Sequence, residues 1–83
     1  SLGNETEAEK AFRRAIELRE NWILPMNGLA ETLIRKANFA EAEPILQKII
    51  ELDTNNPAAH SALADLYLKT NASAETLKNH LQK

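Results

Sequence analysis

The 83-residue sequence contains no cysteine and no valine, and it has only two glycines and three prolines. Without cysteine, the chain can form neither a disulfide framework nor a thiolate metal site, and a cysteine nucleophile is excluded. Valine is among the residues most favoured in β-sheets, whereas glycine and proline interrupt helices. The abundant residues, thirteen alanines and twelve leucines, are strong helix formers. The composition therefore predicts an all-α chain.

Basic residues are not in excess. Ten Lys and Arg residues are outnumbered by twelve Asp and Glu residues, and the net charge at pH 7 is −2. Proteins that bind nucleic acid normally present a basic patch to the phosphates, and no run of basic residues supplies one here. No apolar stretch approaches the roughly 18 residues of a membrane span. We therefore expect no nucleic-acid partner and no membrane insertion, while cytoplasmic and periplasmic locations both stay open.

The sequence repeats itself with a period of 34 residues. A shift of 34 places superimposes identical residues in a first segment, namely Asn4 on Asn38, Glu7 on Glu41, Ala8 on Ala42 and Ile16 on Ile50. The same shift superimposes a second segment of different character, Leu29 on Leu63 and Ala30 on Ala64. One period that relates two adjacent segments indicates a repeated unit of two elements.

Apolar spacing and capping residues predict about five helices joined by short turns. Capping patterns mark three helix starts, at Asn4 with Glu7, at Asn38 with Glu41, and at Asn56 with Pro57. The expected helices span about 4–20, from 22–25 to 36, 38–53, 57–70 and 73–82. Pro44 lies inside the third helix and is expected to bend it locally. Short connections place consecutive helices antiparallel to one another.

The repeat resembles the tetratricopeptide family, in which a 34-residue unit consists of two helices, A and B. The matches are the leucine-then-small pair of helix A and the alanine, aromatic, alanine series of helix B, found here at Leu29-Ala30, Leu63-Ala64 and Ala8, Phe12, Ala15. Ala37 falls at the turn glycine of the family. The resemblance implies a right-handed α-α superhelix, a solenoid of antiparallel helices.

The resemblance weakens toward the end of the chain. Met26 and His60 stand at the tryptophan position of the family, and the last expected helix fits a spacing of 32 residues better than 34. We expect a single domain, 1–83, that consists of a lone helix B (1–21), a full repeat (22–56) and a repeat with a shortened, degenerate second helix (57–83). Repeat arrays need about three stacked units. The sequence is therefore interpreted as a fragment of a longer repeat protein.

No constellation of catalytic or metal-binding residues is recognisable. Catalysis needs a nucleophile, acid or base held in a pocket, and a metal site needs three or four converging ligands. The two histidines lie in different predicted helices. His60, at a core-facing repeat position, is expected to be packed or to lie at the edge of the core, and His80 to lie on the surface. Trp22, the only tryptophan, is expected either to pack over a turn or to contact a partner. The sequence predicts a protein that is not an enzyme and has no cofactor.

The residues expected to bind a partner lie on helix A of each repeat. In the family this helix lines a concave groove that holds a peptide or a helix, so the resemblance implies a scaffold for protein–protein interaction. The matching polar positions are Asn27, Glu31, Arg35, Ser61, Asp65 and Lys69, with Leu24, Ile34, Ala58 and Leu68 between them. Glu31 and Arg35 are four residues apart, as are Asp65 and Lys69. Each pair can instead form an ion pair along its own helix.

Two other functions stay open. The first predicted helix carries an apolar strip that a preceding helix A would cover, formed by Ala8, Ala11, Phe12 and Ala15. An exposed strip of this kind usually finds a partner. The chain would then be a structural module that associates with itself, as a homodimer through its end helices. Alternatively, it would be an accessory segment of a larger enzyme.

Overall fold

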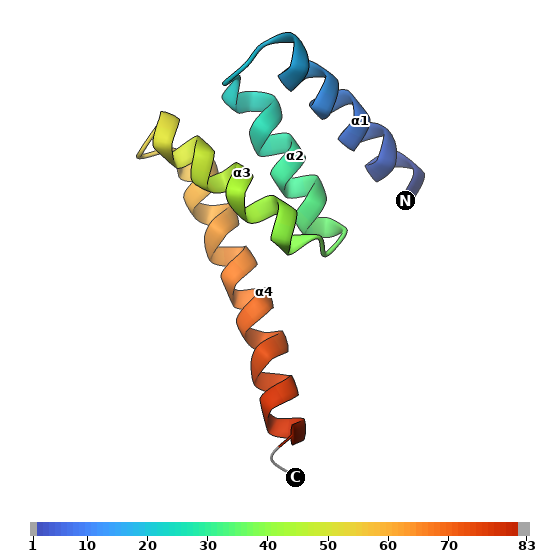
Figure 1. The fold of residues 1–83 in the computed structure, drawn as a ribbon, viewed down its shortest axis with the longest axis vertical. Helices are drawn as coiled ribbons and strands as arrows, with labels where there is room; N and C mark the ends of the chain where they lie inside the picture. The colour runs from blue at the N-terminus through green and yellow to red at the C-terminus, as the bar shows by residue number, and fades with distance from the viewer. Residues whose placement is uncertain (1, 82–83) are drawn as a thin grey trace.

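The computed structural model describes the backbone of residues 2–81 and the side chains of residues 4–71. The described backbone forms four helices, which are α1 (Leu2–Leu18), α2 (Ile23–Arg35), α3 (Phe39–Leu52) and α4 (Pro57–Leu81) (Figure 1). Residues 2–81 contain no strand. The prediction of an all-α fold is confirmed. None of the helices among the described residues is long and apolar enough to cross a membrane.

The helices pack in the order in which they follow one another in the sequence. α1 contacts α2, α2 contacts α3, and α3 contacts α4. α2 also contacts α4, so the two helices that are one period apart lie side by side. The C-terminal half of α4 extends beyond the other three helices, and the longest dimension of the molecule is 51 Å (Figure 1).

The core lies mainly between α2 and α3. Its members are the apolar residues that the helical spacing places on one face of each helix, namely Met26, Leu29, Ala30, Leu33, Ile34, Ala42, Leu46, Ile49, Ala59 and Leu66. Leu33 and Leu46 are among the largest fully buried side chains. α1 contributes only partly buried side chains, including Phe12 and Ile16. α1 therefore packs against the core less completely than α2 and α3 do.

The turn from α2 to α3 ends the first of these helices with an alanine in the left-handed region. Ala37 has φ of 62°. Its N–H donates to the carbonyl of Ile34 over 2.9 Å, and the N–H of Asn38 donates to the carbonyl of Leu33 over 2.8 Å. These two bonds form the Schellman motif, in which glycine is the usual residue at the position of Ala37. Ala37, which stands where the family has its turn glycine, therefore has a backbone conformation that glycine favours.

The three predicted helix starts agree with the structure to different degrees. At α4 the side chain of Asn56 accepts a hydrogen bond from the N–H of Ala59 over 2.9 Å, as expected of a cap. At α3 the Asn38 side chain makes no such bond to the backbone, but its amide donates to the Glu41 carboxylate over 3.0 Å. α1 begins at Leu2, so the predicted start at Asn4 is wrong by two residues. Gly3 and Asn4 each disfavour a helical backbone by only about 1 kcal/mol or less, so they do not prevent the first turn from extending to Leu2.

The predicted break between a fourth and a fifth helix is absent. Residues 57–81 form one helix, where we expected two that meet near residue 72. The segment from Thr70 to Ser73 contains neither glycine nor proline, the two residues that disfavour a helical backbone most strongly. The surface position expected of His80 concerns a side chain outside the described residues. α3, in turn, continues through Pro44 without a break.

A group of charged side chains connects α1 with the α2–α3 turn and with α3. The Glu9 carboxylate accepts hydrogen bonds from Lys36 Nζ over 2.7 Å and from Arg13 Nε over 3.1 Å. Arg13 also donates to Glu41 on α3. The hydrogen bond from Lys36, followed by the one from Arg13, lowers the pKa of Glu9. The network stabilises the position of α1, whose apolar contacts are incomplete.

The lowered pKa of Glu9 makes the contribution of this network depend on pH. A lowered pKa stabilises the fold above the ordinary pKa of a glutamate, about 4.3, and the stabilisation is lost as the pH falls through the lowered value. We expect Glu9→Gln to reduce the free energy of unfolding at pH 7 by about 0.5–1 kcal/mol, because the pairs are partly exposed. Urea unfolding at pH 7 and pH 2.5 measures it. The difference from the original chain should vanish at the lower pH.

The matched control for this experiment is Glu20→Gln, in the exposed turn after α1. It removes the same charge and should leave the urea midpoint at pH 7 within experimental error. An equal effect of both substitutions at pH 7 would mean that net charge, rather than the contacts of Glu9, determines the stability.

Candidate functional site

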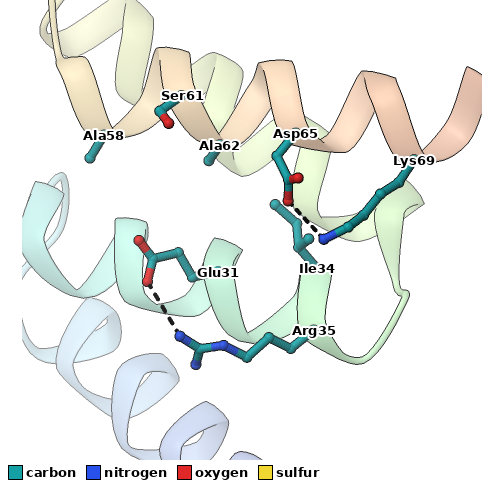
Figure 2. A pocket seen from close by; sticks show the side chains of 8 residues that line it. All are labelled: Glu31, Ile34, Arg35, Ala58, Ser61, Ala62, Asp65 and Lys69. Atoms are coloured by element: carbon teal, nitrogen blue, oxygen red, sulfur yellow. Dashed lines mark hydrogen bonds and ion pairs between the residues drawn. The ribbon is translucent and has the colours of Figure 1, made fainter.

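A pocket of about 520 Å³ lies between α2 and α4, the two helices that are one period apart. It is lined by Glu31, Ile34 and Arg35 of α2 and by Ala58, Ser61, Ala62, Asp65 and Lys69 of α4. The side of α4 that faces α2 carries short side chains at Ala58, Ser61 and Ala62, which leave the space open (Figure 2). Ile34 is almost fully buried and supplies an apolar surface.

Two ion pairs border this pocket, one on each helix. Lys69 Nζ lies 2.8 Å from Asp65 Oδ2 on α4, and Arg35 Nη2 lies 3.9 Å from Glu31 Oε2 on α2 (Figure 2). All four side chains are about half exposed or more. Exposed pairs of this kind contribute about 0–1 kcal/mol to stability. The four groups can therefore rearrange at little cost in free energy, and each helix carries an acid and a base at the border of the pocket.

Five of the six predicted polar residues line the pocket, and these are Glu31, Arg35, Ser61, Asp65 and Lys69. Asn27 does not line it. The Asn27 side-chain amide donates to Asn56 Oδ1 over 3.3 Å, while its own oxygen is buried without a hydrogen-bond partner among the described residues. Because Asn56 caps α4, Asn27 helps to hold the start of α4 against α2. The structure gives it a positioning role.

Three apolar residues differ from the predicted lining of the groove. Leu24 and Leu68 are 75% and 71% exposed but lie outside the pocket lining. Ala62 lines the pocket although the sequence reasoning missed it. Its spacing could have revealed it, because Ala58, Ala62 and Asp65 follow one another at intervals of four and three along one helix face.

The remaining candidates for chemistry are separate from the pocket. Of the two positions expected for His60, the packed one is wrong, since the residue is exposed and its ring Nε2 lies 2.6 Å from the carbonyl oxygen of Thr54. Trp22 is half buried at the start of α2, and the Arg19 guanidinium lies 5.1 Å from its ring centroid. Within residues 4–71, no three His, Asp or Glu side chains are grouped so as to hold a metal ion.

A second, mainly apolar pocket of about 370 Å³ lies on the part of the surface where α1 and α3 flank α2. Ile16, Met26, Leu29 and Ile45 supply its apolar lining, and the paired side chains Arg13 and Glu41 lie at its border. It shares no lining residue with the pocket between α2 and α4.

Comparison with known proteins identifies the family of this chain. A family model described as tetratricopeptide repeat matches two overlapping stretches, residues 1–66 and 33–75. Comparisons with curated proteins and with solved structures give no significant match. The matched stretches cover most of the chain, and they include the helix pairs that the 34-residue period relates. The chain therefore belongs to the tetratricopeptide repeat family.

Proposed function

We propose that the chain is a protein-interaction module that binds an extended peptide or a helix of a partner protein in the pocket between α2 and α4. Repeats of this family generally mediate protein–protein interaction and are typically not catalytic. The observation that supports this site is the arrangement of an acid and a base on each of two adjacent helices around an open pocket with an apolar surface.

The charges of the pocket define the kind of ligand. Glu31 and Asp65 are one period apart, as are Arg35 and Lys69, so each helix presents the same charge pattern. A peptide that carries both a basic and an acidic side chain can replace the ion pairs within each helix by pairs with the ligand. Exposed charges chiefly steer the encounter and set specificity, so binding should weaken as salt is added.

The charge-reversed variant Glu31→Lys with Asp65→Lys tests this proposal. Peptides that bind the original chain are first selected from a displayed library of unstructured peptides, and their affinity is then measured by fluorescence anisotropy. We expect the variant to bind the selected peptides at least tenfold more weakly, about 1.4 kcal/mol. Reversing the basic side chains of the peptide to acidic ones should restore part of the lost affinity.

The matched control is Glu17→Lys with Glu51→Lys, which makes the same change of charge at two exposed positions that are also one period apart. It should leave the affinity within about twofold, a small free-energy difference. Equal losses in both variants would indicate a non-specific effect of net charge. Unchanged binding by the Glu31/Asp65 variant, at unchanged helicity, would contradict the proposed site.

A further inference from the structure

A groove on the surface of the molecule runs between α1 and α3, with α2 beneath it. The mainly apolar pocket of about 370 Å³ forms part of this groove, and a smaller pocket of about 270 Å³ adjoins it along α1. α1 and α3 each pack on α2, but no backbone contact joins α1 to α3 among the described residues. Arg13 and Glu41 pair across the gap. The α1–α3 groove is therefore formed by three consecutive helices and bridged at this ion pair.

The floor and walls of the α1–α3 groove are apolar. Met26 and Leu29 of α2 form the floor, and Ile16 of α1 and Ile45 of α3 are half-buried on either side. Pro44 is exposed on the same wall as Ile45. Proline is the residue that helix interiors tolerate least, and residues that break such a local rule are expected mainly at functional sites. A role in an apolar contact surface therefore accounts for Pro44 better than helix stability does.

A basic side chain at the border of the groove is uncompensated. Lys48 of α3 is exposed and forms no ion pair with any described side chain. Its counterpart one period earlier, Arg14, has Nη1 at 3.7 Å from Glu17 Oε2, whereas Glu51, at the same spacing from Lys48, makes no such pair. The other charged residues of the larger pocket pair with each other. The groove therefore combines an apolar lining with an ammonium group that is available to a carboxylate.

We propose that the α1–α3 groove binds an amphipathic helix of a partner protein, with a large apolar side chain between Ile16 and Ile45 and a carboxylate on Lys48. The carboxylate follows from charge complementarity. The occupant is a helix because an extended peptide would bury backbone N–H and C=O groups against an apolar lining that offers them few partners, whereas a helix pairs its own. This site shares no lining residue with the pocket between α2 and α4, so either proposal can fail without the other.

Helical peptides of about 20 residues, long enough to form a helix in isolation, serve as probes. They are displayed as a library in which the residues of one face vary, and binders are selected on the Glu31→Lys, Asp65→Lys variant, whose α2–α4 pocket is altered. One anchored side chain makes a small interface, so we expect dissociation constants of about 1–100 μM. The selected peptides should share a large apolar residue and an acidic residue three or four positions from it, since these positions lie on one helix face.

Pro44→Glu blocks the groove with little risk to α3, because it replaces a helix-disfavouring residue by a helix former. The introduced carboxylate lies one turn before Lys48 and can pair with it in place of the ligand. Fluorescence anisotropy should show at least tenfold weaker binding of the selected peptides, about 1.4 kcal/mol. Lys48→Glu should also weaken binding, and changing the acidic residue of the peptide to lysine should restore it.

The matched control is Pro57→Glu, the same change at the exposed first residue of α4, and it should leave the affinity within about twofold. Equal losses in both variants, peptides that bind Pro44→Glu unchanged, or a library without any binder below about 1 mM would overturn the proposal. Peptides that keep their affinity when a central proline prevents helix formation would show an extended occupant instead. A chain that dimerises in sedimentation velocity, and no longer does so with Pro44→Glu, would make a second copy the occupant and exclude the partner helix.

Discussion

Leu46→Ala is expected to lower the free energy of unfolding by about 3–4 kcal/mol, within the range for fully buried leucines. Leu46 has no exposed surface and lies in the core that α2, α3 and α4 share. The substitution removes apolar contacts and leaves a cavity that the surrounding helices fill only in part. A domain of this size is stable by about 4–12 kcal/mol in total, so one substitution would remove a large share of the stability. Urea unfolding followed by circular dichroism measures the loss.

The control for Leu46→Ala is Leu18→Ala, which removes the same atoms at a position that is 71% exposed. Its effect should stay within about 0.5 kcal/mol, as for most surface substitutions. Similar losses for both leucines would show that burial does not account for the destabilisation, since alanine is the better helix former at either position. The core between α2 and α3 would then be less tightly packed than described.

Gly28→Leu is expected to separate α1 from α2 and to destabilise the chain by about 2–3 kcal/mol through overpacking. Gly28 lies inside α2, where a glycine normally weakens a helix. Its place is explained by Phe12 of α1, because a Cβ atom at residue 28 would lie 2.5 Å from Cζ of that ring. A leucine side chain requires the ring, and with it α1, to move. Fluorescence of Trp22, which lies between these helices along the chain, reports the separation in urea unfolding.

A compensating pair distinguishes overpacking from other effects of the glycine. Gly28→Ala alone combines a gain in helix propensity of about 1 kcal/mol with a clash against Phe12. Adding Phe12→Leu makes room for the new methyl group. The free energy of unfolding of the double variant should therefore exceed the value expected from adding the two single effects by about 1 kcal/mol. Strict additivity would contradict direct packing of residue 12 on residue 28.

The central part of the fold could be predicted from the sequence because several local signals agree there. The apolar spacing predicts α2 and α3, the turn at Ala37 separates these two helices, and the cap at Asn56 marks the start of α4. At the chain ends the signals are weaker. Thr70 to Ser73 contain no helix breaker, so the break expected from the period alone does not occur. The exposure of His60 could not be predicted because it depends on which helix covers α4.

The pocket could be predicted in part. Helical spacing and the family pattern together place Glu31, Arg35, Asp65 and Lys69 on facing sides of α2 and α4, where the structure has them. The ion pairs within each helix follow from spacing alone. The role of Asn27 could not be predicted, because it depends on the distance between its amide and the cap of α4, which only the packing of two helices determines.

The pattern of helix contacts has a consequence for how the chain folds and unfolds. Contacts between the described helices join neighbours or next neighbours along the chain, and none joins α1 to α4. Chains with mostly local contacts fold quickly, since little loop entropy is lost before packing begins. In repeat proteins the stability is a sum over adjacent interfaces, so folding can begin at the best-buried pair and spread outward. The α2–α3 pair is then the nucleus, and hydrogen-exchange protection decreases from it toward both ends of the molecule.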